Sequence, residues 1–426
     1  MGNTGIILKE GTFMKRRSFI HSGGILAAAG LSCSESPINH TGLPDLPAIP
    51  GDSADERNSY VSSMLDILCN YCGPRPAGSK GYDLAADIVR RDLNRSAETE
   101  FDTYTFERWL PKRDPELTIG EETIHAYYGI GSSSTPAGGI NGILKTAEGR
   151  VPYAIVHPDT GSLLAHLATS PRANAERARS VSTYGLEPHC PPFVIVGTHT
   201  EEQLKKAVEE ELPVSLTASV EFTEDVPTSN VVATIPGISS EEVLYVAHLD
   251  TVYPSPGAND NASSVILIML LAHALSGKKP KHTLRFIATA DEETGSHGMG
   301  TYLKRRRENI TIGQVLASVN FDSVTWGPNL DLRSQNSDTR RIFAEIDHDL
   351  QLPGIPKIIE NQIYSMDNRW FRDYPAVDAI TVGSIGYDNA DYCWHRPNDI
   401  PENVPMECME PSFLMFREYI ARTEGI

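Results

Sequence analysis

The chain has 426 residues, which is enough for one or two domains and a targeting segment. Hydrophobic residues make up 40% of it and charged residues 22%, an ordinary balance for a globular protein. Its 56 acidic and 37 basic side chains give a formal net charge of −19, which argues against nucleic acid or an anionic membrane surface as the main partner. An acidic surface is also common in soluble secreted proteins, so the charge by itself indicates no function.

Residues 1–33 have the pattern of an export signal. A basic segment with the pair Arg16-Arg17 precedes the apolar, small-residue run 23–31, which is too short to span a bilayer. The paired arginines resemble a twin-arginine signal, which predicts a periplasmic or extracellular protein. Cys33 follows the apolar run, and two fates stay open: a lipid on Cys33 that anchors the chain to a membrane, or ordinary signal cleavage.

Composition and periodicity divide the rest of the chain. Residues 34–52 are rich in Pro, Ser and Gly and are predicted to be a linker. Residues 53–110 begin a first domain, with helical patterns at 55–69 and 81–94. Residues 111–228 contain short apolar runs separated by turns, which predicts a small β-rich insertion.

The first domain resumes over residues 229–426, where short apolar strands alternate with helices. The predicted strands are Val243–Ala247, Leu284–Ala290, Val315–Phe321 and Ala376–Val382. A long apolar helix is predicted between Asn261 and Ser276, with Asp260 or Asn261 as its N-cap and Gly277 after its end. This alternation predicts an α/β domain with a mostly parallel central sheet flanked by helices.

Five cysteines follow the signal: Cys69, Cys72, Cys190, Cys393 and Cys408. Export would permit disulfides. The pair Cys69-x-x-Cys72 has no second pair to complete a four-cysteine zinc site, so core packing or one local disulfide is favoured. A disulfide between Cys393 and Cys408 stays open.

Ionisable side chains follow the predicted strands at their carboxyl ends. They are His248 and Asp250, then Asp291, Glu292 and Glu293, then Asp322, with Asp260 in the turn before the long helix and His395 in a late loop. Ligands bind at this edge in open α/β sheets. A single acid at a strand end is usually a cap or a solvated turn residue, but crowded carboxylates resist ionisation without a cation. Mixed imidazole and carboxylate groups suit zinc, so the pattern predicts a metal site.

These motifs resemble the M28 zinc peptidase family. The similar segments are His248-Leu249-Asp250, Gly257-Ala258-Asn259-Asp260-Asn261-Ala262-Ser263, Glu292-Glu293, Asn320-Phe321-Asp322 and His395, with Arg75-Pro76-Ala77-Gly78-Ser79 upstream. The resemblance covers most of residues 51–110 and 229–426. It implies that residues 53–110 and 229–426 form a catalytic domain that binds two Zn²⁺ ions.

The resemblance also implies a role for each metal ligand. His248 and Asp322 would bind one zinc ion. Glu293 and His395 would bind the other, and Asp260 would bridge the two.

Two further acids would serve the reaction. Glu292 would be the general base, which takes a proton from the attacking water and gives it to the leaving amine. Asp250 would hold the His248 ring through its second nitrogen.

The loop around His395 departs from the family. Trp394 and Arg396 flank His395 where the family often has Tyr and Thr. The substrate-contacting tyrosine is therefore unassigned, and Tyr387 and Tyr392 are the candidates.

Residues 111–228 resemble a protease-associated domain through Gly139–Leu144 and Ser229–Gly237. Such a domain would restrict substrate access to the active site. The alternative is a β-rich insertion without a functional role.

The combined hypothesis is an exported aminopeptidase that acts on peptide N-termini. A carboxypeptidase or a glutaminyl cyclase is the alternative on the same fold, and the candidate carboxylate clamps for the former are Arg333, Arg369, Arg372 and Arg396. A non-catalytic binding protein is disfavoured because the base and all five ligands are present. Peptides are the expected partners, a membrane only through a lipid on Cys33, and the oligomeric state is left open.

Overall fold

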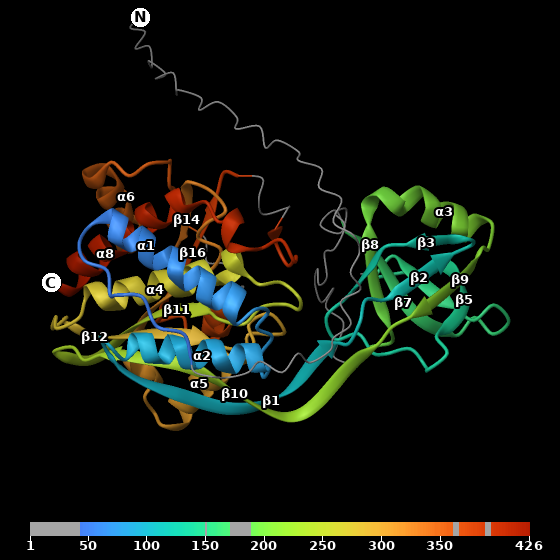
Figure 1. Cartoon of the computed structure of the whole chain (residues 1–426), viewed down its shortest axis with the longest axis horizontal. Helices are drawn as coiled ribbons and strands as arrows, with labels where there is room; N and C mark the ends of the chain where they lie inside the picture. Colours follow the sequence, from blue (N-terminus) through green and yellow to red (C-terminus); the bar gives the residue numbers. More distant parts are fainter. Residues whose placement is uncertain (1–42, 150, 171–188, 361–365, 388–392) are drawn as a thin grey trace, which may run out of the picture. The chain divides into compact units, whose positions relative to one another are not determined.

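The computed structural model describes residues 43–149, 151–170, 189–360, 366–387 and 393–426 (Figure 1). The predicted export signal at residues 1–33, with Cys33, and the first part of the predicted linker lie outside these ranges. Within them, no helix is both long and apolar enough to cross a membrane.

An eight-stranded sheet forms the centre of the first domain. Its strand order is β1 (Glu98–Pro111), β10 (Val220–Ile235), β12 (His282–Thr289), β11 (Ser239–His248), β13 (Val315–Phe321), β16 (Asp378–Ile385), β14 (Asn329–Arg333) and β15 (Lys357–Ile359). The central strands from β12 to β16 run parallel, whereas β10 and β14 join them antiparallel. The prediction of an α/β fold with a central sheet flanked by helices is confirmed.

Alternate side chains of the central strands enter two different cores. On β11, Tyr245 belongs to the larger core, while Leu244 and Val246 pack into a smaller one with Met299. The larger core is covered by α1 (Ala54–Leu65), α2 (Lys80–Leu93), α4 (Ser263–Ala274), α6 (Ser337–Leu350) and α8 (Met409–Glu424). The smaller core is covered by α5 (His297–Glu308) and the short helix η6 (Met366–Asp373). The strands therefore read as continuous apolar runs because both faces are buried.

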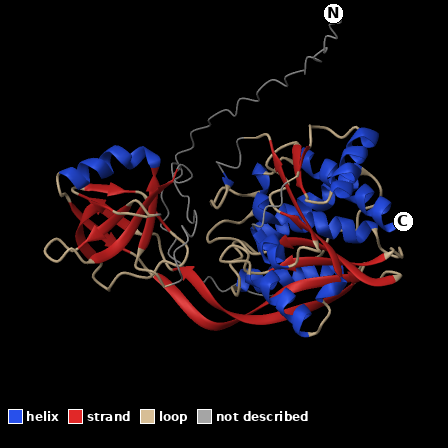
Figure 2. Ribbon diagram, turned by 180° about the vertical axis from the view of Figure 1, so that it is seen from behind, coloured by secondary structure: helices blue, strands red, loops and turns tan. Residues whose placement is uncertain are grey.

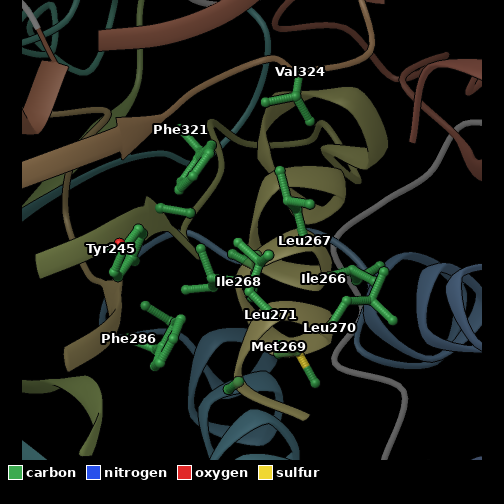
Figure 3. Packing of buried hydrophobic residues seen from close by; sticks show 14 of the residues in the cluster. Tyr245, Ile266, Leu267, Ile268, Met269, Leu270, Leu271, Phe286, Phe321 and Val324 are labelled. Atoms are coloured by element: carbon green, nitrogen blue, oxygen red, sulfur yellow. The ribbon is translucent and has the colours of Figure 1, made fainter. Parts of the chain in front are cut away.

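Helix α4 is the most deeply buried helix of this domain. Every residue from Ser263 to His273 is buried, because α1, α2 and α8 pack against it as well as the sheet. Figure 3 shows Ile268 and Leu271 of α4 on the side of the sheet residues Tyr245 and Phe286. This packing holds the start of α4, and the turn before it, against the carboxyl edge of the sheet.

Strands β1 and β10 form one long antiparallel pair that leads into and out of a second sheet (Figure 2). The second sheet has the order β3 (Glu122–Ile124), β2 (Glu116–Ile119), β9 (Pro213–Thr217), β5 (Ile140–Thr146), β6 (Tyr153–Val156), β7 (Leu163–Ser170), β8 (Phe193–Gly197) and β4 (Ala126–Tyr128). Helix α3 (Glu201–Glu209) contributes Leu204 and Ala207 to its core. The identity of this unit as a protease-associated domain stays a prediction.

The predicted N-cap of the long helix is wrong. Asp260 and Asn261 lie in η4 (Ala258–Ala262) with non-helical backbone angles, and α4 begins at Ser263. The Asn261 side chain instead donates to the main-chain oxygen of Phe321 at 2.9 Å and accepts from the main-chain nitrogen of Ser323 at 3.1 Å. Asn261 therefore connects this turn to the end of β13 rather than capping a helix.

All five cysteines in the described residues are free thiols. Cys69, Cys72, Cys393 and Cys408 are buried, as core packing requires. Cys393 and Cys408, for which a disulfide was left open, are not bonded to each other in the structure.

Candidate metal centre

The predicted ligands meet at the carboxyl edge of the central sheet. His248 is the last residue of β11, Glu293 lies in the turn after β12, and Asp322 directly follows β13. Asp260 comes from η4 and His395 from a loop that follows β16. Parallel strands bring their carboxyl ends to one edge, which is why residues so far apart in sequence converge.

The carboxylate of Asp260 lies between the two histidines. Its Oδ1 atom is 3.2 Å from Nε2 of His248, and its Oδ2 atom is 3.4 Å from Nε2 of His395. His395 Nε2 is also 2.9 Å from Oε2 of Glu293, and His248 Nε2 is 3.8 Å from Oδ2 of Asp322. Each oxygen of Asp260 therefore faces a separate pair made of one histidine and one acid.

This cluster is buried and its acids outnumber its bases. The side chains of the five residues are only 3 to 10% exposed. Oε1 of Glu293 is buried without a hydrogen-bond partner, which is costly unless another group binds it. Atoms of His248, Asp260 and Glu293 lie within 4.8 Å of one another, which is close enough for these residues to hold metal. The donor set and the unpaired oxygen fit a metal ion such as zinc.

Burial and neighbouring charges shift the pKa values of the carboxylates in this cluster in opposite directions. Burial raises the pKa of Glu292 well above its usual value, and repulsion by Glu293 and Asp322 raises it further. Burial also acts to raise the pKa of Asp260, but hydrogen bonds from His248 and His395 outweigh it and lower that pKa. A bound cation would favour the charged form of every carboxylate here.

Asp250 contacts the second nitrogen of His248 chiefly through its main chain. Its main-chain oxygen, not its carboxylate, is the nearest partner of His248 Nδ1, at 3.1 Å against 3.8 Å. The carboxylate accepts hydrogen bonds from the main-chain nitrogens of Glu292 at 3.0 Å and Glu293 at 3.2 Å. Burial raises the pKa of Asp250 to about 8. Asp250 therefore fixes the turn that carries Glu292 and Glu293.

Asp399 is a residue of the site that the sequence interpretation missed. Its Oδ1 atom accepts from the main-chain nitrogen of Asn259 at 2.8 Å and from the Asn259 side chain at 2.7 Å. Its Oδ2 atom accepts from the main-chain nitrogen of Asp260 at 3.0 Å. Burial raises the pKa of Asp399 to about 7. The position of Asp260 thus depends on an acid that follows His395 by four residues.

Arg75 is the second missed residue. Its guanidinium is fully buried and donates to the main-chain oxygens of Leu249, Pro256 and Gly257. These carbonyls belong to the loop that connects His248 to Asp260. The motif around Arg75 was recognised in the sequence, but no local signal shows that an arginine is buried.

The structure describes only one of the two predicted substrate tyrosines. Tyr387 is 39% exposed, and its hydroxyl donates to Glu407 at 3.3 Å. Tyr392 lies outside the described residues. Trp394 stands where the family often has Tyr, and its ring stacks on His395 with the ring centroids 3.5 Å apart.

Comparison with known proteins finds a family model that matches the segment carrying these residues. Residues 230–420 match the family model described as peptidase family M28. The chain is 28% identical to the probable lipoprotein aminopeptidase LpqL of Mycobacterium tuberculosis, over 65% of this chain and 60% of LpqL. It therefore spans less than two thirds of that relative. It is 26% identical to carboxypeptidase Q of Mus musculus, over 74% of this chain and 76% of the relative.

A solved structure shares the fold. BSAP, a zinc aminopeptidase from Bacillus subtilis, superposes with a TM-score of 0.68 at 17% identity, over 89% of this chain and 96% of BSAP.

Proposed function

Because residues 230–420 match the model of peptidase family M28, we propose that this chain is an exported zinc aminopeptidase that removes N-terminal residues from peptides. The observation that carries the proposal is the position of Asp260, whose two oxygens face two separate histidine–acid pairs. That arrangement suits two metal ions bridged by one carboxylate. The names of LpqL and BSAP support the aminopeptidase reading.

The ligands divide into two sets. His248 and Asp322 would hold one ion, Glu293 and His395 the other, and Asp260 would bind both. Two zinc ions held there would lower the pKa of a water molecule to ~7 and polarise the scissile carbonyl.

Glu292 is proposed as the general base. It lies next to the ligand Glu293, and the main-chain nitrogens of both residues are held by the Asp250 carboxylate. The Glu292 carboxylate accepts a hydrogen bond from Ser296 Oγ at 3.3 Å, and it makes no contact of ion-pair length with the two histidines among the described residues. It is therefore free to accept a proton from the attacking water and to deliver it to the leaving amine.

The acidic surroundings favour a cationic substrate group. A protonated α-amine would lie near Glu292, Glu293 and Asp322, which places the first peptide bond at the cluster. Acetylation removes that charge, so an N-acetylated peptide should not be cleaved measurably, while the free peptide and its C-terminal amide should both be cleaved. Product analysis by liquid chromatography checks this. Cleavage of the acetylated peptide, with no cleavage of the amide, would instead favour the carboxypeptidase alternative that carboxypeptidase Q suggests.

Replacing Asp399, which is not a proposed ligand but holds the turn of Asp260, tests whether the cluster binds metal. In Asp399→Asn, one oxygen that accepts from main-chain nitrogens becomes a donor, so the turn that carries Asp260 should shift. Loss of such an outer partner typically lowers metal affinity by about 10- to 100-fold. Zinc titration against a competing chelator measures the change, with Asp338→Asn on the exposed start of α6 as the matched control. Equal affinity in both variants would show that Asp399 does not support the metal site.

Export is proposed from residues 1–33 and from the relative named as a lipoprotein. Replacing Arg16 and Arg17 with Lys keeps the charge but should abolish a twin-arginine route, so the precursor should accumulate in the cytoplasm. Cell fractionation checks this, and unchanged export would indicate a general secretory route. Incorporation of labelled fatty acid that is lost in Cys33→Ser would separately establish lipidation.

A further inference from the structure

A pocket that is partly open to solvent shares the residue Glu293 with the metal centre. Part of its wall comes from the catalytic turns and includes Asp250, Asp291 and Glu293. Another part comes from β1 and includes Phe106, Arg108 and Trp109. Because Glu293 belongs to both the pocket and the metal cluster, a group bound in the pocket would lie beside the proposed reaction site.

Two acids of this wall already have partners. Main-chain nitrogens bind Asp250, and His297 Nδ1 lies 2.5 Å from Asp291. The capacity of these two acids to bind a substrate cation inside the pocket is therefore reduced. The aromatic and aliphatic side chains beside them leave an apolar space.

Arg108 is the basic residue among the described residues that line this pocket. Its Nη1 atom donates to the main-chain oxygen of Gly78 at 3.1 Å, and its Nε atom is buried without a hydrogen-bond partner. In the described part of the chain, Arg108 has no acid within ion-pair distance, although Glu107 beside it is paired with His189. A guanidinium that lines the pocket without an acidic partner among the described residues favours an anionic acceptor there.

We propose that the pocket binds the residue on the leaving side of the scissile bond, and that Arg108 pairs with the free α-carboxylate of that residue. The preferred substrates are then dipeptides with an apolar second residue. This inference rests on the proposed aminopeptidase activity. A dipeptide has a single peptide bond, so one site would bind both its free amine and its free carboxylate.

The test compares Leu-Phe with Leu-Phe amide, which differ only in the charge that Arg108 would bind. The wild-type enzyme should cleave the acid with a kcat/KM about 10- to 100-fold above that of the amide, mostly through KM. Arg108→Gln should remove most of this preference while retaining a donor for Gly78. Arg108→Lys should retain part of it, because Lys keeps the charge but lacks the planar fork.

The ratio of acid to amide within each variant does not depend on how much of the enzyme folds. Arg113→Gln, an exposed arginine beyond the end of β1, is the matched control and should keep the wild-type ratio. Equal kcat/KM for acid and amide in the wild type, or an unchanged ratio in Arg108→Gln, would overturn the inference. N-acetyl-Leu-Phe separates this from the proposed function: its cleavage would refute the aminopeptidase activity, whereas its resistance with equal acid and amide rates would refute only the role of Arg108.

Discussion

Replacing Glu292 with Gln should lower kcat by about 10²–10⁴-fold and leave the bound metal in place. Gln has the size of Glu but cannot accept a proton from water at neutral pH. Glu292 is not one of the five proposed ligands, and its main-chain nitrogen, held by Asp250, is unaffected by the change. The loss should therefore appear in kcat and not in metal content, which kinetics and elemental analysis of the same sample can establish.

Glu345→Gln is a suitable control for this experiment, because Glu345 lies on an exposed part of α6 and pairs only with Arg341 among the described residues. It should keep wild-type kinetics. If Glu292→Gln retains near-wild-type turnover with full metal, another group takes the proton. If the variant loses metal as well, Glu292 contributes to binding and its role must be reassigned.

The fold was predictable because its signals are local. The strands of the central sheet are buried on both faces, so each appears as a short apolar run, and α4 appears as an apolar run of helical length. Their alternation predicted the α/β sheet, and the position of acids and histidines after these runs predicted which residues converge. His248, Asp260, Glu293, Asp322 and His395 do lie together in the structure.

What the sequence could not predict depends on contacts between distant segments. Asp399 bonds to a turn 139 residues earlier in the chain, and Arg75 bonds to carbonyls more than 170 residues later. Both act on main-chain atoms, which carry no residue-specific signal. Asp250 does contact Nδ1 of His248, as predicted, but chiefly through its main-chain oxygen, and the sequence did not indicate that its carboxylate also binds main-chain nitrogens.

Arg108 shows a similar limit of sequence reasoning. The carboxylate clamps predicted from the sequence, Arg333, Arg369, Arg372 and Arg396, all lie within residues 229–426. Arg333 is engaged by both oxygens of Asp331 at 2.7 Å. Arg108 lies on the strand that leads to the insertion, and only the pairing of β1 with β10 brings that strand into the wall of the pocket.

Asp260→Asn should reduce both metal content and activity more than any other single change among the ligands. A carboxylate offers an anionic oxygen to each histidine–acid pair, whereas an amide offers one neutral oxygen and a donor that would face the second pair. Removing one negative charge from between two dications leaves their repulsion less compensated. Bound zinc should therefore fall toward one ion or fewer, and activity should fall with it.

The comparison with Glu293→Gln distinguishes a bridging ligand from a ligand of one ion. Among the described residues, the Glu293 carboxylate lies within ion-pair distance of His395 and not of His248, so its replacement should weaken one site and leave the pair of His248 and Asp322 able to bind. Zinc titration of the two variants should thus show one retained binding event in Glu293→Gln and weakened binding at both sites in Asp260→Asn. Full retention of two zinc ions by Asp260→Asn would exclude the bridging role, because no other carboxylate in the described cluster lies between the two histidines.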